Sequence, residues 1–112
     1  MVQVTKQNGL FTFHIQGWHK LWALKSEITI PEGNISRAYR GSNFNMSIWS
    51  LRLPGTHLPG LVTAGTFINK QGITFCDYSN KNNLLIVELN NEHYNTLAVE
   101  VEDVEAALKL FS

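Results

Sequence analysis

The fold is decided where the sequence changes its period, in residues 96–111, TLAVEVEDVEAALKLF. In the first part Leu97, Val99 and Val101 are every second residue, which is typical of a β-strand with one face in a core. From residue 103 the apolar residues instead follow the i, i+3, i+4, i+7 spacing of one helical stripe. The members of this stripe are Val104, Ala107, Leu108 and Phe111. We therefore predict a final strand followed by an amphipathic C-terminal helix.

The start of this helix is also marked in the sequence. Asp103 directly precedes the stripe, and an aspartate at this position can accept a hydrogen bond from the backbone of the first turn. Glu105 then places a negative charge in the first turn, where it interacts favourably with the helix dipole. Helix initiation at residue 103 is the expected result.

The rest of the chain mostly has a period of two. Asn8-Gly9 is a strong signal for a two-residue hairpin turn, and residues 84–89 are nearly all apolar, as in a strand buried on both faces. Strands are predicted around residues 2–4, 11–15, 28–30, 48–53, 61–69, 73–79, 84–89 and 96–101. Residues 18–25 are also strand-like, although their apolar residues do not define one face. Several short strands closed by one helix predict a mainly β domain, either a small barrel or a bent sandwich with the helix over one mouth.

Composition limits the classes of function. The chain has 112 residues, enough for one domain spanning 1–112, with 44% hydrophobic residues and a formal net charge of +0. A neutral surface provides no long-range attraction to nucleic acid or anionic lipid. Cys76 is the only cysteine, so no intrachain disulfide can form. The sequence has neither a signal-peptide pattern nor an apolar run of membrane-spanning length, and we expect a cytoplasmic protein.

The strongest candidate for a site is the loop at residues 52–67, RLPGTHLPGLVTAGTF, with two Leu-Pro-Gly triplets. Each proline favours the second position of a tight turn, and each glycine can adopt the positive φ of the third. Two consecutive turns would present a rigid tip, either as a ligand or interaction loop or as a corner that only positions two strands. The candidate residues are Arg52, Thr56, His57 and Thr66.

Catalytic and metal-binding patterns are not found. The four histidines are scattered, and none has a cysteine or carboxylate at zinc-site spacing beside it. Cys76 lies within a predicted strand and next to Asp77, an arrangement that does not lower a thiol pKa. No nucleophile elbow, P-loop or H-E-x-x-H motif occurs. We predict a non-enzyme with no catalytic residue, metal site or cofactor.

Several segments together resemble a known family. They are WALK at 22–25, RLPGTHLPG and AGTF within 52–67, GITFCD at 72–77, and YNTLAVEVEDVE at 94–105. This set is similar to a family of uncharacterised bacterial proteins with a pleckstrin-homology-like (PH-like) fold. The resemblance implies a small barrel of about seven antiparallel strands in two near-orthogonal sheets, capped by one C-terminal helix. It implies no activity, because a fold alone does not supply one.

Phosphoinositide binding is not expected, although a PH-like fold invites the idea. Headgroup binding needs clustered basic residues, and the first hairpin offers Lys6 alone, followed by Gln7, Asn8 and Gly9. Nucleic-acid binding is not expected either, because the aromatic residues of the strands have no basic residues interleaved among them.

These observations favour a non-catalytic module for protein interaction or self-assembly, acting through sheet edges and loops. The alternative is a barrel that binds a small molecule or lipid with the 52–67 loop. It is less favoured because small barrels are normally filled by their own side chains. An enzyme that depends on Cys76 is the least favoured hypothesis.

Overall fold

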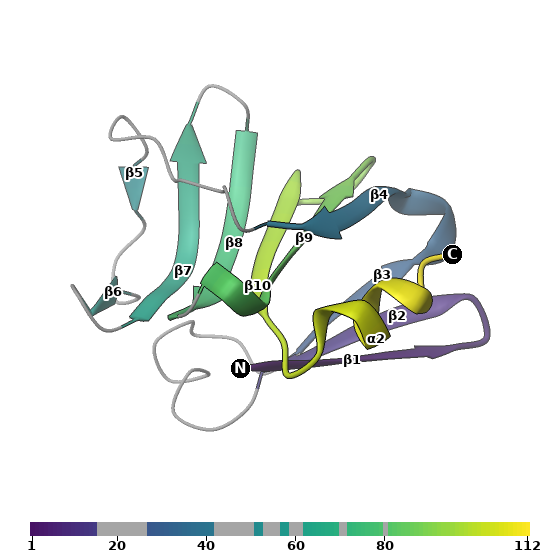
Figure 1. Ribbon diagram of the computed structural model, residues 1–112. Coiled ribbons are helices and arrows are strands. Elements are labelled where there is room, and N and C mark those ends of the chain that lie inside the picture. Colours follow the sequence, from purple (N-terminus) through teal and green to yellow (C-terminus); the bar gives the residue numbers. More distant parts are fainter. Residues whose placement is uncertain (16–26, 42–50, 53–56, 59–61, 70–71, 80) are drawn as a thin grey trace.

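A computed structural model describes residues 1–15, 27–41, 51–52, 57–58, 62–69, 72–79 and 81–112. The described residues are mainly β: ten strands, eight of them at least five residues long, form two sheets (Figure 1). One short α-helix near the C-terminus completes the described part of the chain. The predicted β-rich class and C-terminal helix are confirmed.

The small sheet is an antiparallel meander in the order β1-β2-β3. Its strands are β1 (Val2–Gln7), β2 (Leu10–Ile15) and β3 (Glu27–Pro31). Asn8 and Gly9 connect the first two strands with φ angles of 54° and 78°, as a hairpin turn with two left-handed residues requires. The predicted hairpin is therefore confirmed.

The large sheet has the order β4-β9-β10-β8-β7-β5, and β6 also pairs with β7. Its strands are β4 (Ile35–Arg40), β5 (Leu51–Arg52), β6 (His57–Leu58), β7 (Val62–Asn69), β8 (Gly72–Tyr78), β9 (Leu84–Leu89) and β10 (Thr96–Glu100). Two single-turn 3-10 helices, η1 (Glu32–Asn34) and η2 (Lys81–Asn83), precede β4 and β9. The predicted strand at 48–53 lies partly, and the strand-like segment at 18–25 wholly, outside the described residues.

The order of the large sheet corrects the expectation of an all-antiparallel fold. β10 lies between β8 and β9, antiparallel to β9 and parallel to β8. Thus β8 and β9, which follow each other in the chain, are not neighbours in the sheet. β8 and β9 run in opposite directions. A strand between them must therefore be parallel to one and antiparallel to the other.

The expected barrel of about seven strands is also corrected, because the eight longer described strands lie in two sheets that do not close into one. A barrel needs an unbroken ladder of paired strands. The chain passes from the small to the large sheet through η1, but in the described residues β3 pairs only with β2, and β4 only with β9. In Figure 1 the strands of the small sheet run across the view, whereas β7 and β8 run up it.

The main core lies between the two sheets and the helix. β9 contributes Leu85, Val87 and Leu89 to this core, and its alternate residues Leu84 and Ile86 to a second cluster. Because the two sets alternate along the strand, β9 is buried on both faces, as its apolar sequence predicts. The second cluster also contains Phe67, Cys76, Tyr78 and Ala98, with Tyr39 packed against it.

The C-terminal helix α2 (Val104–Lys109) packs on the main core. Its N-cap is Asp103, whose Oδ1 accepts a hydrogen bond from the backbone N–H of Ala106 at 3.1 Å. Just beyond the helix, the ring of Phe111 stacks on that of Phe11 in β2, with centroids 4.5 Å apart. The predicted cap and the inward stripe are confirmed, although Leu108 is only half-buried.

Gly72, at the start of β8, is the glycine whose replacement should most perturb the sheet. Its φ is +120°, and an added Cβ would collide with the side chain of Asn95. The Oδ1 of Asn95 accepts a hydrogen bond from Ile73 N at 2.8 Å, so moving it disrupts the ladder. We expect Gly72→Ala to lower the free energy of unfolding by about 1–3 kcal/mol in denaturant titration. Gly33→Ala is the control, expected within about ±0.5 kcal/mol because open space surrounds that position.

Candidate functional site

The predicted loop residues lie beside β7. Arg52 in β5 pairs with Phe67, and His57 in β6 pairs with Thr63, so their partners are four positions apart on β7. Four positions on a strand span about 13 Å. Thr66 is half-buried on β7, opposite Phe75. Thr56 and most of both Leu-Pro-Gly triplets lie outside the described residues, so the role of this loop stays a prediction.

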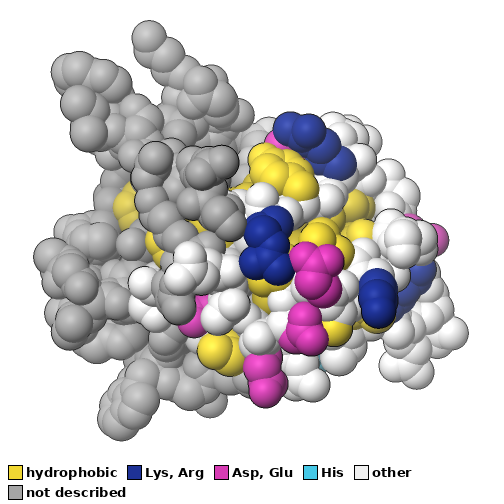
Figure 2. Space-filling model, in the orientation of Figure 1, with side chains coloured by type: hydrophobic (Ala, Val, Ile, Leu, Met, Phe, Trp, Pro, Cys, Tyr) yellow, Lys and Arg dark blue, Asp and Glu magenta, His cyan; other side chains and the backbone are white. Residues whose placement is uncertain are grey.

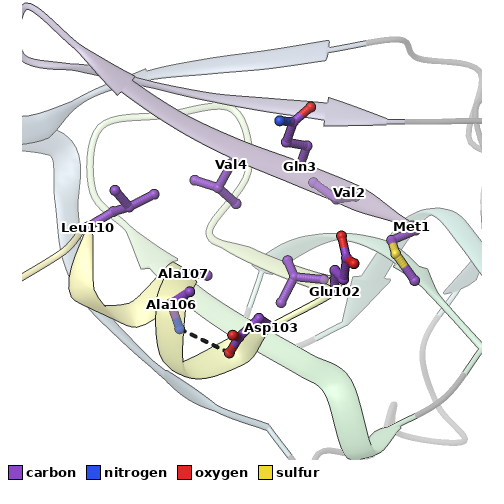
Figure 3. A pocket seen from close by; sticks show the side chains of 10 residues that line it. Met1, Val2, Gln3, Val4, Glu102, Asp103, Ala106, Ala107 and Leu110 are labelled. Carbon is purple, nitrogen blue, oxygen red and sulfur yellow. Dashed lines mark hydrogen bonds between the residues drawn. The ribbon is translucent and has the colours of Figure 1, made fainter.

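A groove of about 450 Å³ lies elsewhere, between β1 and α2 (Figure 3). Its lining is apolar along Val2, Val4, Ala107 and Leu110, and acidic where Glu102 and Asp103 border one end. Figure 3 shows that Val4 points toward the helix, whereas Gln3 points away from it. The groove therefore lies under the core face of β1, and it joins elements from opposite ends of the sequence.

The edge of β1 borders this groove. Gln7 and Leu10 flank the two-residue turn, and such a flanking pair exchanges hydrogen bonds between its strands. Because this pattern alternates, the backbone groups of Val2, Val4 and Lys6 point away from β2. In the described residues β1 pairs only with β2. Its outward backbone groups therefore lie directly beside an apolar groove.

The other sheet edges are protected in ways that β1 is not. The backbone groups of Leu10 point toward β1, so those of Pro31, opposite Leu10 on β3, point outward from the sheet. Proline has no N–H to donate at this outward position. β4 has a shift of register between Ile35 and Arg37, and it carries Arg40 as a second positive charge. At the other end of the large sheet, β5 and β6 are two residues each. In the described residues, β1 is the long, regular edge strand without such protection.

The face shown in Figure 2 carries basic and acidic side chains interspersed with apolar ones. They do not gather into a basic patch among the described residues of this face. Within the described part of this face, positive and negative side chains are therefore mixed.

A polar cluster on β4 and β9 links Arg37, Tyr39 and Glu88. Arg37 donates to both carboxylate oxygens of Glu88 at 2.9 Å, and the Tyr39 hydroxyl donates to Oε2 at 2.8 Å. The guanidinium also lies 4.6 Å from the centroid of the Tyr39 ring. These bonds hold β4 to β9 just after its shift of register, so the cluster has a structural role in fixing the edge strand.

The hydrogen bonds from Arg37, followed by that from Tyr39, hold the pKa of Glu88 below its ordinary value of 4.5. A lowered pKa means that this interaction stabilises the fold above the unfolded-state pKa, and that the stabilisation is lost as pH falls through the folded-state value. We expect Glu88 to titrate below 4.5 in a carboxyl NMR titration, and Arg37→Ala to raise its midpoint. Tyr39→Phe should raise it less. An unchanged midpoint in Arg37→Ala would contradict the assignment.

Cys76 is fully buried on β8, in the second cluster. Burial, with a further contribution from the neighbouring Asp77 carboxylate, raises the pKa of its thiol well above the ordinary value. A thiol with a raised pKa is protonated at neutral pH and is a poor nucleophile.

We therefore expect iodoacetamide to alkylate Cys76 slowly in the folded protein at neutral pH, and rapidly in denaturant. Mass spectrometry of timed samples measures both rates. Folded and unfolded protein reacting at the same rate would show that the thiol is reachable and ionised, and would reopen the hypothesis of a thiol enzyme.

Two of the histidines, His14 and His93, contact neighbouring side chains. His14 Nδ1 lies 3.6 Å from Glu27 Oε2, and the ring of His93 packs edge-on against Tyr94. Among the described residues no three His, Cys, Asp or Glu side chains group closely enough to hold a metal ion. The helix in that part of the chain is too short to cross a membrane.

Comparison with models of known protein families, with curated proteins and with solved structures finds no match to this chain. The resemblance to PH-like bacterial proteins therefore stays a prediction.

Sequence reasoning missed the groove, although it recognised the two elements that form it. The alternation of Val2 and Val4 and the stripe that includes Ala107 are both visible in the sequence. What is not visible is that β1 and α2 lie side by side, because they are separated by most of the chain. One signal of an open edge was available: residues 2–7 contain no proline and only one charged residue, Lys6, whereas protected edge strands often carry several such residues.

Proposed function

We propose that this chain is a non-catalytic protein-interaction module that binds an extended segment of protein along β1. The observation that carries the proposal is the juxtaposition of an unprotected strand edge with an apolar groove. Strand addition uses these two features together, since main-chain hydrogen bonds provide affinity and pockets for alternate side chains provide specificity.

The two features have matching positions. A segment added to β1 would pair with the outward backbone groups of Val2, Val4 and Lys6. Side chains directly opposite each other lie on the same face of a sheet. The residues opposite Val2 and Val4 would therefore point to the core side, into the groove beside Ala107 and Leu110.

This proposal does not depend on the family resemblance. The alternative, a small-molecule or lipid site formed by Arg52, Thr56, His57 and Thr66, stays a prediction because only part of that loop is described.

The test is selection of a phage-displayed library of random peptides on the immobilised protein. We expect enriched peptides to alternate apolar and polar residues, and to shift the backbone amide NMR signals of Val2, Val4 and Lys6. Val4→Pro should abolish binding, because it removes an outward N–H while leaving the ladder to β2 intact. Val4→Ala is its matched control, because it shortens the same side chain but keeps the N–H.

A second pair of variants tests the groove without altering the strand. Ala106 is exposed and lines the groove, so Ala106→Trp should fill it and block binding. Lys109→Trp, on the same helix but away from the groove lining, should bind normally. Equal melting temperatures would show that the variants are folded. Failure to enrich any peptide on protein that is a monomer, or binding that survives both Val4→Pro and Ala106→Trp, would overturn the proposal.

A further inference from the structure

We infer that the segment bound along β1 is β1 of a second copy of this chain, antiparallel to the first, about a twofold axis through Val4. This inference rests on the proposed function and names its partner. Twofold dimers are the commonest symmetric assemblies, and their interface must be self-complementary. The β1 edge meets this requirement in its backbone, its apolar residues and its charges.

The backbone register follows from the outward positions. With the axis through Val4, Val4 faces the same residue of the partner subunit, and Val2 faces Lys6 of the partner subunit. All of these positions point their N–H and C=O groups away from β2, so they can exchange hydrogen bonds across the interface. The two small sheets would then form one continuous antiparallel sheet.

The side chains on the core face suit this register. Val4 of the partner subunit would stand beside Val4, on the side that opens into the groove over Ala106 and Ala107. Branched side chains on neighbouring strands pack well against each other. On the outer face, Gln3 would lie opposite Thr5 of the partner subunit, so that no like charges oppose each other within the paired strands.

Charge complementarity favours the antiparallel orientation of the two β1 strands. The acidic end of the groove, at Glu102 and Asp103, is the end that Val2 borders. Met1 borders the same end, and its ammonium group lies 3.5 Å from Asp77 Oδ2. In the antiparallel register Lys6 of the partner subunit faces Val2, and so its ammonium group lies at this acidic end. A parallel, in-register pairing would instead place Lys6 beside Lys6 of the partner subunit, and like charges side by side are unfavourable.

Lys6 is able to make this contact. In the single chain its Nζ lies 2.8 Å from Glu32 Oε2, but the two side chains are 34% and 55% exposed. Exposed ion pairs contribute little to stability and are readily exchanged. The chain thus carries both the acidic groove end and the basic residue, four positions along β1 from Val2, that complements it. This is the reason to favour a second copy over an unrelated basic segment.

The test is sedimentation equilibrium on the full chain over a range of concentrations, with reciprocal charge variants. Wild type should be a dimer. Lys6→Glu alone would add a third carboxylate beside Glu102 and Asp103 at each end of the interface, and Glu102→Lys alone would place two ammonium groups there. We expect each variant by itself to dimerise at least about tenfold more weakly, because like charges are then juxtaposed twice per dimer. An equimolar mixture should recover dimerisation as a heterodimer, in which both ends have opposite charges.

Glu32→Gln is the control, since it removes the ion-pair partner of Lys6 without touching the groove and leaves the contact of Lys6 with the Phe11 ring, and it should not weaken the dimer. Val4→Pro should give a monomer that is still folded, with the β-rich circular dichroism spectrum of the wild type.

The failures of the two proposals are distinguishable. A wild-type monomer whose peptide binding is lost in Val4→Pro would overturn the second-copy inference and leave the proposed function standing. If Val4→Pro and both charge variants dimerise as strongly as the wild type, self-association uses another surface of the protein, and the inference is overturned. If the protein neither binds a peptide nor forms a dimer, both the proposed function and the inference are overturned.

Discussion

The rest of the structure depends on the insertion of β10 between β8 and β9. The strands on its two sides have buried, apolar residues, including Phe75 and Leu85, so their backbone groups must be paired within the protein. Buried backbone groups left unpaired are costly, so a third strand must fill the space between them. β10 does so with a parallel ladder to β8 and an antiparallel ladder to β9.

This insertion also sets the position of α2. The helix begins four residues after β10 ends, so it must lie close to the end of that strand, where it covers the space between the two sheets. The stacking of Phe111 on Phe11 then fastens its far end to β2. In the middle of the helix, Ala106 and Ala107 are too short to reach β1, and the groove remains between the helix and β1. The groove is thus a consequence of small residues within the helix and a large aromatic ring beyond its C-terminal end.

The parts of the fold that could be predicted are those encoded by neighbouring residues. The Asn8-Gly9 hairpin, the cap at Asp103, the helical stripe and the doubly buried strand at 84–89 each follow from local spacing and local chemistry. The parallel pairing of β8 with β10 could not be predicted, because periodicity identifies a strand but not its neighbour. For the same reason the groove was missed, and a loop with strong turn residues was chosen as the candidate site instead. Turn residues report backbone geometry, which a structural corner needs as much as a binding loop does.

The central place of β10 also has a consequence for the order of folding. Its contacts with β9 close only a short connection, whereas its contacts with β8 join residues such as Thr74 and Thr96 across the whole of β9. Short-range contacts cost less chain entropy and form sooner, so β9 and β10 are expected to pair first and to dock on β8 as a unit. During synthesis the large sheet cannot be completed until residues 96–100 have left the ribosome. Before that moment, β8 and β9 present apolar faces and unpaired edges to their surroundings. The nascent chain is therefore most exposed to aggregation just before its last strand arrives.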